Sequence, residues 1–349
     1  MIYFKQKNDT NFSLSIDDTQ IIKGVAICLM LWHHLFLWSP EYGSFVLWIA
    51  QFGKVCVSLF LFVSAYGLTV QYNKIFDKPI TSTFKFQMKR FVKFYANYWV
   101  IFLIVVPIGV FILGRSLNIP YENSNVIKST ITDFLAMNGY RSYNVIWWFN
   151  RLIVCLYFLF PILYFITKRW TILFLTGLVF LLLLLRTEMP IWTLQFVLGI
   201  AFALYINQLN RFLNRFNFWI LLSILLFVFS ILFYLRNAAI IPFFTDIKVD
   251  TFQAVTIILM VLLIIRRIHA FNSTLKFLGK HSMNMYMIHM FICYYFFKNF
   301  TYSFKYPLLI FTVLLAICLI ISMIIEYGKK IAGLPVLIKK INTKIENNV

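Results

Sequence analysis

The chain has 349 residues, of which 61% are hydrophobic and 13% are charged, and its mean hydropathy is +0.82. These values exclude an ordinary soluble domain and are typical of a protein that crosses a membrane several times. The formal charge of +20 does not indicate a nucleic-acid-binding protein, because the basic residues are dispersed through short loops between apolar segments.

The apolar segments predict an all-α integral membrane protein with about ten spanning helices. They lie near residues 21–38, 48–70, 95–113, 146–166, 170–186, 190–206, 218–235, 252–265, 283–297 and 307–327. Several of these runs reach the roughly 20 residues that cross a bilayer. The longest loop, about 114–145, is too short to bury a core of its own, so we expect one membrane domain over residues 1–349.

The distribution of basic residues predicts the orientation of the chain. With the N-terminus inside the cell, 22 of the 32 Lys and Arg residues fall on the cytoplasmic side, and the outer loops hold eight. Loops rich in Lys and Arg stay in the cytoplasm. We therefore expect both termini to be cytoplasmic.

The first predicted span carries two ionisable side chains, Lys23 and His34. At about 100° per residue, their eleven-residue spacing returns to within about 20° of its start, so both share one helix face, about 16 Å apart. Ionisable residues within a bilayer indicate a functional site. The alternative is that Lys23 reaches the lipid headgroups and His34 is a hydrogen-bonded packing residue.

The second predicted span contains GKVCVSLFLFVSAYGL. Lys54 lies near its outer end, and we expect this lysine to face an aqueous cavity. Ser64 lies near the middle of the membrane beside Ala65 and Gly67. Small residues at this spacing favour close helix packing over a site.

A basic segment, MKRFVKFYANYW, runs into the third predicted span. Its cations are Lys89, Arg90 and Lys93. They are typical of a topology anchor, and they also suit a rim that binds the phosphates of a donor through charge-assisted hydrogen bonds. The two interpretations are compatible.

The fourth span, VIWWFNRLIVCLYFLFP, places Trp148, Asn150 and Arg151 close to the outer surface. Arginine within a span rarely faces lipid. An aromatic surface beside Asn and Arg suits a sugar ring, although tryptophans at this depth are equally typical of an interfacial belt.

The ninth span carries Tyr286 and His289 in MYMIHMF. A second histidine within the membrane strengthens the interpretation as a site. A neutral imidazole can take a proton from a hydroxyl group in a transfer reaction.

The five cysteines do not indicate a metal site or a disulfide framework. All of them lie inside apolar runs, without CxxC or paired-histidine spacing. We expect them to be packing residues and expect no bound metal.

Six segments of this chain, in order, resemble the membrane acyltransferase-3 proteins that modify polysaccharides and surface glycans. They are KGVAICLMLWHH, GKVCVSLFLFVSAYGL, MKRFVKFYANYW, VIWWFNRLIVCLYFLFP, TLQFVLGIAFALYI and LGKHSMNMYMIHMF. The chain departs from the family pattern in having Lys23 instead of Arg, Ala65 instead of Gly, and Ala96 instead of Pro. The extra His33 is not at the family position, and it is turned about 80° away from the Lys23 face. We therefore expect His34 to be the functional histidine.

The resemblance implies acyl transfer from cytoplasmic acyl-CoA, commonly acetyl-CoA, to a glycan hydroxyl at or beyond the outer face of a bacterial cytoplasmic membrane. His34 is then the general base or a transient acyl carrier, and Lys23 lies beside the donor route. The resemblance assigns donor phosphates to Lys89, Arg90 and Lys93, and acceptor binding or support to Lys54, Ser64, Trp148, Asn150, Arg151, Tyr286 and His289. Acyl-CoA is a co-substrate rather than a bound cofactor, and polysaccharide-assembly proteins are possible partners.

A transporter is the alternative from a different functional class. In an exporter or flippase of polysaccharide or lipid-linked sugar, the ionisable residues within the spans would line a conduit. They are Lys23, His34, Lys54, Arg151 and His289. The product distinguishes the two functions, because only the enzyme forms an acyl ester.

Overall fold

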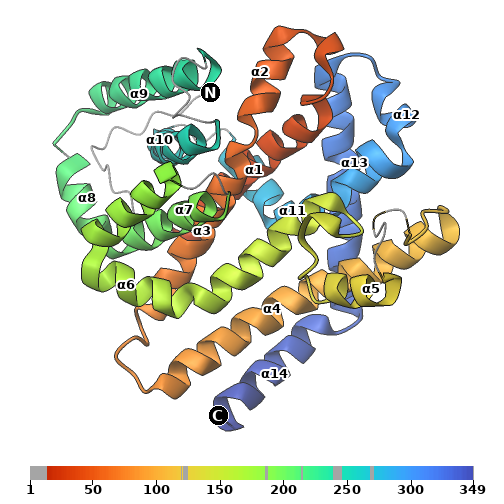
Figure 1. Cartoon of the computed structure of the whole chain (residues 1–349), viewed down its shortest axis with the longest axis horizontal. Coiled ribbons are helices and arrows are strands. Elements are labelled where there is room, and N and C mark those ends of the chain that lie inside the picture. Colours follow the sequence, from red (N-terminus) through yellow and green to blue (C-terminus); the bar gives the residue numbers. More distant parts are fainter. Residues whose placement is uncertain are drawn as a thin grey trace. The chain divides into compact units, whose positions relative to one another are not determined.

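The computed structural model describes residues 14–118, 120, 125–184, 188–213, 215–238, 246–267 and 271–348. The regular structure of this described part is entirely helical and includes no strand. Figure 1 shows these helices with the labels used below. The prediction of an all-α fold is confirmed.

The chain divides into two compact units. Unit 1 comprises Met1–Asn73 and Ile162–Ser282, and unit 2 comprises Lys74–Pro161 and Met283–Val349. Two of the division points lie within helices, one in α6 and one in α11. The single domain over residues 1–349 stays a prediction.

Unit 1 is built around α3 (Val55–Tyr72), which packs against α1, α7 and α10. The other helices of the unit are α1 (Ile16–Phe36), α2 (Ser44–Phe52), α7 (Glu188–Leu204), α8 (Ile206–Leu213), α9 (Phe218–Ala238), α10 (Asp246–Arg267), the end of α6 and the start of α11. A helix that is apolar on all sides belongs in a core. Buried residues are distributed around α3 accordingly.

Small residues bring α3 close to α7. A Cβ atom at Gly199 of α7 would lie less than 3.0 Å from the carbonyl oxygen of Phe62 and from the side chain of Ala65. Such close helix contact is the usual role of small residues within a membrane. The packing interpretation is thus supported for Ala65, whereas a Cβ at Gly67 would meet no atom within 4 Å.

Two glycines bring α1 close to the first half of α11 (Asn272–Met290). A Cβ at Gly24 would lie less than 3.0 Å from backbone atoms of Leu275, and a Cβ at Gly279 would lie equally close to the backbone of Gln20. Close by, Lys276 forms an ion pair with Asp17 at 2.5 Å. This crossing positions the start of α1, including Lys23.

Unit 2 contains two long helices, α4 (Ile80–Pro107) and α13 (Pro307–Ile331). Its other helices are η2 (Ile108–Ile112), α5 (Val126–Phe134), η3 (Gly139–Arg141), η4 (Val145–Trp147), the start of α6 (Trp148–Leu184), the end of α11, η5 (Phe291–Phe296), α12 (Lys298–Tyr302) and α14 (Leu334–Asn348). The C-terminal helix α14 lies alongside α4 (Figure 1).

Six segments of the described chain are long and apolar enough to cross a membrane. They are Ile16–Phe36, Ser44–Tyr72, Ile80–Ile112, Val145–Leu181, Phe218–Leu235 and Pro307–Ile331. The pair formed by residues 192–204 and 206–213, bent by 77°, would be a seventh span. The count of about ten spans and the cytoplasmic termini stay predictions.

Several predicted boundaries differ from the observed helices. The predicted helices 146–166 and 170–186 form one helix, α6, which is interrupted by the non-helical backbone of Trp170. The predicted helices 95–113 and 283–297 begin much earlier, at Ile80 and Asn272. Helices continue beyond the apolar run that marks the bilayer, so hydropathy alone places their ends poorly.

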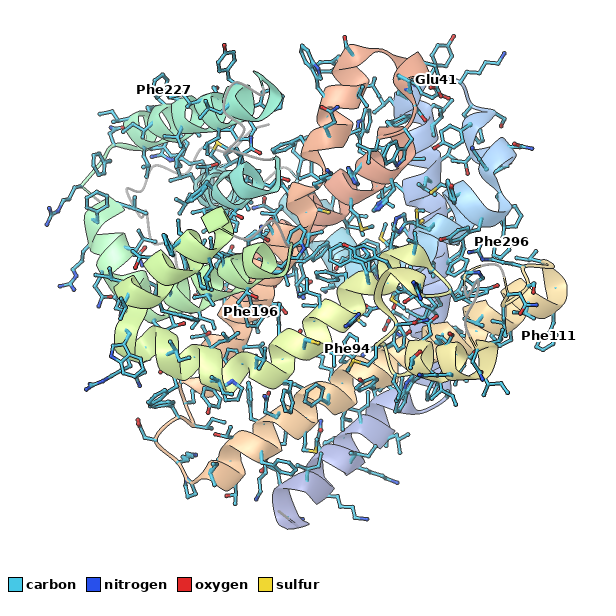
Figure 2. All side chains as sticks on the ribbon, in the orientation of Figure 1. Glu41, Phe94, Phe111, Phe196, Phe227 and Phe296 are labelled. Atoms are coloured by element: carbon cyan, nitrogen blue, oxygen red, sulfur yellow. The ribbon has the colours of Figure 1, made fainter. Side chains whose placement is uncertain are left out.

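Large apolar side chains cover much of the surface. Phe111 of η2 is 85% exposed and Phe227 of α9 is 68% exposed, whereas Phe196 of α7 is fully buried (Figure 2). An apolar surface of this kind suits contact with lipid, as expected for a membrane protein.

Candidate functional site

His34 lies half-buried near the end of α1. Its Nδ1 is 3.0 Å from the carbonyl oxygen of Met30, one turn earlier in the same helix. A carbonyl oxygen only accepts hydrogen bonds, so in the neutral ring Nδ1 carries the hydrogen and Nε2 is the basic nitrogen. The backbone therefore selects the tautomer in which Nε2 can accept a proton.

The neighbouring His33 has a different environment. It is buried, and its Nδ1 donates to the carbonyl oxygen of Ala50 in α2 at 2.6 Å. The two imidazole rings meet edge to face, with centroids 5.0 Å apart. His33 thus ties α2 to α1, which supports a packing role for His33 and leaves His34 as the candidate base.

Lys23 and His34 lie on one face of α1 but are not adjacent. Ile27 and Met30, which occupy the same face between them, are both buried, whereas the two polar side chains are half-buried. Eleven residues of helix correspond to about 16 Å. The pair therefore marks two ends of one helix face rather than one contact.

Lys54 and Ser64 are both half-buried in unit 1. Lys54 lies at the turn between α2 and α3, where the predicted second span is interrupted, and Ser64 lies within α3. The aqueous cavity at Lys54 stays a prediction.

In unit 2, residues 144–150, which include η4 and the start of α6, contact one turn of α11. Asn150 is buried and donates to the sulfur of Met287 at 3.3 Å. Trp147 Nε1 and Asn144 Nδ2 each donate to the Met287 carbonyl oxygen at 3.2 Å. Tyr286 donates its hydroxyl hydrogen to the carbonyl oxygen of Ile146. Two predicted site residues, Asn150 of α6 and Tyr286 of α11, therefore take part in the contact between these segments.

His289 lies one turn further along α11 and is fully buried. Its Nδ1 is 2.9 Å from the carbonyl oxygen of Tyr286 and 3.2 Å from that of Met285. As in His34, the nitrogen that faces backbone carbonyls carries the hydrogen, and Nε2 is the basic nitrogen of the neutral ring.

Trp148 and Arg151 contact the short helix η3 instead. The Trp148 ring stacks on Tyr140, with centroids 5.3 Å apart. Arg151 is exposed, and its guanidinium lies beside Gly139, where an added Cβ would be 3.0 Å from Nη1. Among the predicted acceptor residues of unit 2, Asn150 and His289 are buried, Trp148 and Tyr286 are half-buried, and Arg151 is exposed.

The predicted donor cations on α4 have three different environments. Lys89 pairs with Glu346 of α14, whose backbone carbonyl also accepts from Lys85 at 2.7 Å. Lys93 is exposed one turn beyond Lys89, on the same face. The Arg90 guanidinium instead lies over the Phe86 ring, 5.2 Å from its centroid.

We expect acid to release the end of α14 from α4. The hydrogen bond and charge of Lys89 lower the pKa of Glu346. This carboxylate stabilises the contact above its unfolded pKa of about 4.3, and the stabilisation is lost as pH falls through the lowered folded pKa. The distance between spin labels at Thr81 and Thr343, measured by electron paramagnetic resonance, should lengthen as the pH falls from about 6 to about 3. The Glu346→Gln variant should show no such pH dependence, and an equal response in both proteins would contradict the expectation.

The loop predicted near residues 114–145 contains a polar cluster that sequence reasoning missed. Asp133 is fully buried and accepts from the backbone N–H of Tyr143 at 2.6 Å. The Tyr98 hydroxyl donates to the Asp133 carbonyl at 2.6 Å. Burial raises the pKa of Tyr143 to about 12, although the nearby Arg115 charge opposes the increase. The polar run DFLAMNGYRSYN was the available signal.

A second missed network surrounds Lys329 at the end of α13. This lysine is 5% exposed and donates to Asn97 at 2.9 Å, Asn284 at 3.1 Å and Glu326 at 2.7 Å. The three-residue spacing of Glu326 and Lys329 was the only sequence signal, because such pairs share a helix face.

A third set of buried polar residues lies in unit 1. Gln195 of α7 donates to the Thr251 hydroxyl of α10 at 2.9 Å. Asp250 and Gln253 of α10 are also buried. Asp250 and Thr251 lie just outside the apolar segment predicted at 252–265, so the sequence analysis did not consider them. Among the described residues, no group of three or more His, Cys, Asp or Glu side chains is arranged to hold a metal ion.

Comparison with known proteins gives one match. A family model described as an acyltransferase domain matches residues 16–327. This range includes every predicted site residue and excludes the α14 helix. No curated protein and no solved structure matches the chain.

Proposed function

The chain belongs to the acyltransferase-3 family, and from this premise we propose that it transfers an acyl group, most simply acetyl, from cytoplasmic acyl-CoA to a hydroxyl of a cell-surface or lipid-linked glycan. Family membership and the apolar helices together make it a membrane acyltransferase. The proposed setting is a bacterial cytoplasmic membrane, with polysaccharide-assembly proteins as partners.

The observation that carries the proposal is the geometry of His34. Its Nδ1–H is bound to the Met30 carbonyl, so Nε2 carries no hydrogen in the neutral ring and has the chemical form that a general base requires. Nε2 takes the proton from the acceptor hydroxyl as its oxygen attacks the thioester carbon. The carbon–sulfur bond then breaks, and the imidazolium returns the proton to the departing thiolate. The alternative at the same nitrogen is that Nε2 attacks first and carries the acyl group.

The donor phosphates are proposed to bind to cations of α4, and Lys23 of α1 is proposed to lie beside the donor route. Lys23 lies beside the Gly24 crossing in unit 1, and Lys89 and Lys93 share one face of α4 in unit 2. Lysine ammonium groups bind phosphate oxygens by charge-assisted hydrogen bonds. Because the Arg90 guanidinium lies over the Phe86 ring, we propose that Arg90 has a supporting role in phosphate binding and that Lys89 and Lys93 have the main role.

The acceptor is proposed to bind through the polar and aromatic residues of α6 and α11. Trp148 and Arg151 offer a partly accessible aromatic surface and a cation. Asn150 and His289 are buried, and Asn150 and Tyr286 each bond across to the other segment. Lys54 and Ser64 are proposed as further supporting residues for acceptor binding.

Mass spectrometry and NMR of surface glycan test the proposed reaction. Cells that make the protein should carry acyl esters that are absent from cells without it, and purified protein supplied with labelled acetyl-CoA should transfer the label. Unchanged ester content together with glycan retained inside the cell would contradict acyl transfer and support an exporter or flippase.

A further inference from the structure

The C-terminal helix α14 lies against the cationic face of α4 (Figure 1). Lys85, Lys89 and Lys93 follow one another on α4 at four-residue spacing, and neighbours at this spacing share a helix face. Lys89 forms an ion pair with the side chain of Glu346 of α14, and Lys85 donates to the backbone carbonyl of the same residue at 2.7 Å. Lys89, one of the proposed donor cations, is therefore already paired within the protein.

Three lysines surround the single carboxylate of Glu346. Lys89 and Lys85 bond to this residue, and the charge of Lys78, just before α4, acts on the same carboxylate. A carboxylate carries one negative charge, whereas a phosphate monoester carries about −1.5 to −2 at pH 7. A ligand with several phosphates thus offers more negative charge to this lysine cluster than Glu346 does, and ammonium groups bind phosphate oxygens by charge-assisted hydrogen bonds.

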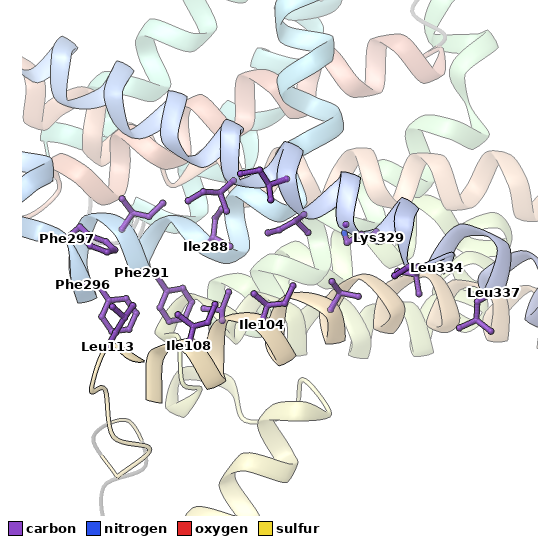
Figure 3. Close-up of a pocket in the computed structure, with 18 residues that line it drawn as sticks. Ile104, Ile108, Leu113, Ile288, Phe291, Phe296, Phe297, Lys329, Leu334 and Leu337 are labelled. Carbon is purple, nitrogen blue, oxygen red and sulfur yellow. The ribbon is translucent and has the colours of Figure 1, made fainter. Parts of the chain in front are cut away.

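The packing beneath α14 is light. None of its described side chains is fully buried, and its inner face, formed by Leu334, Ile338, Asn342 and Ile345, is half-buried. Leu334 also lines an apolar groove of about 610 Å³, whose walls come from helices that include α4, α13 and α14 (Figure 3). An element with few buried apolar contacts opens at low free-energy cost. We therefore expect α14 to separate from α4 more readily than the other helices of unit 2.

A short connection attaches α14 to α13. Helix α13 ends at Ile331, α14 begins at Leu334, and Gly333 between them has φ = 69°. This left-handed conformation favours glycine, whose backbone also adopts conformations that other residues rarely reach. A rotation at Gly333 therefore moves α14 as one piece. The region that matches the family model ends at residue 327, so such a movement leaves the matched domain in place.

We propose that α14 is an internal competitor of the acyl donor. Glu346 and the phosphates of acyl-CoA bind the same lysines, so the donor binds after α14 has left α4. Lys85 thereby joins Lys89 and Lys93 among the donor-binding residues. The inference rests on the proposed function and adds a means of regulation, because any condition that releases α14 lowers the donor concentration at which the enzyme works.

Cross-linking with a carbodiimide tests this competition in the purified full-length protein. The reagent joins a lysine to a carboxylate in contact with it, so it should link Lys89 to Glu346 in a yield that mass spectrometry measures. At about ten times its dissociation constant, coenzyme A should lower this yield about tenfold by mass action. Pantetheine, which lacks the phosphates, should not. Lys276 and Asp17 form an ion pair of similar exposure, and their cross-link is the control for loss of reagent.

The outcomes of the cross-linking experiment separate the donor from other anions. An unchanged Lys89–Glu346 cross-link, equal loss of both cross-links, or an equal effect of pantetheine would each overturn the proposal. The same measurement in nanodiscs of phosphatidylcholine and of anionic phosphatidylglycerol distinguishes the donor from lipid headgroups. Loss of the cross-link in phosphatidylglycerol without any effect of coenzyme A would assign the lysine cluster to lipid and contradict competition with the donor.

Substitutions test the competition without a reagent. Glu346→Gln removes the competing charge and should tighten the binding of labelled coenzyme A about two- to fivefold, as expected for loss of one exposed ion pair. Lys85→Gln keeps the pair between Lys89 and Glu346 but removes a phosphate ligand, and it should weaken this binding. Glu41→Gln removes an exposed carboxylate from η1 and should leave binding unchanged. Unchanged binding by Glu346→Gln, or an equal change with Glu41→Gln, would show that α14 does not compete.

These binding measurements are separate from catalysis. If coenzyme A releases α14 but purified protein transfers no acyl group, the proposed function fails and the competition stands. If acyl transfer occurs while coenzyme A leaves the Lys89–Glu346 cross-link unchanged, the competition fails and the proposed function stands.

Discussion

His34→Ala is expected to abolish acyl transfer while the protein accumulates in the membrane at its normal level. Loss of a general base lowers the rate of a transfer reaction by about 10²–10⁴. The structural cost should be small, because this half-buried ring bonds a backbone carbonyl of its own helix. Ester content of the glycan gives the activity, and size-exclusion chromatography of the solubilised protein gives the folded amount.

His33→Ala is the matched control for this prediction, and we expect the opposite pattern. The Ala50 carbonyl would lose its 2.6 Å partner inside the protein, at a cost of about 1–3 kcal/mol. The remaining folded protein should keep most of its activity per molecule. Substantial activity in His34→Ala would contradict the role of His34, and unchanged stability of His33→Ala would contradict its packing role.

Gly279→Ala is expected to destabilise the protein and to lower its activity together. The new Cβ would lie less than 3.0 Å from the backbone of Gln20, so α1 and α11 would have to separate. Overpacking of this kind costs about 1–3 kcal/mol. Because α1 carries both Lys23 and His34, its displacement also moves the candidate site. The melting temperature of purified protein and acyl transfer by the same sample measure the two effects.

Gly67→Ala makes the same change where no atom lies within 4 Å of the new Cβ. Alanine is favoured over glycine in a helix by about 1 kcal/mol, so this variant should be as stable as the parent or slightly more stable. If the two alanine variants had the same melting temperature, the close crossing of α1 and α11 at Gly279 would be wrong.

The sequence alone predicted the helical elements best where the bilayer itself requires them. The apolar run predicted at 307–327 corresponds to α13, which begins at Pro307, and the run at 218–235 corresponds to α9, which begins at Phe218. A bilayer leaves no water to satisfy backbone groups, so long apolar runs must be helical. The same argument says nothing about where a helix ends outside the lipid, and the starts of α4 and α11 were therefore missed.

For the candidate site, the periodicity of one helix placed Lys23 and His34 on a shared face and turned His33 away from it. That much is local geometry. The sequence did not reveal which backbone carbonyl each imidazole meets, although those carbonyls distinguish a base from a packing residue. It also gave no sign that Lys89 pairs with Glu346, far along the chain.

The sequence by itself thus determined the membrane class, the helical fold and the faces on which polar residues lie, because hydropathy and helical period are properties of a single segment. Only the tertiary structure decided which glycines permit helix crossings, which buried polar groups have partners, and where the apolar helices leave a groove. These features depend on pairs of atoms from distant segments. No periodicity within one segment contains that information.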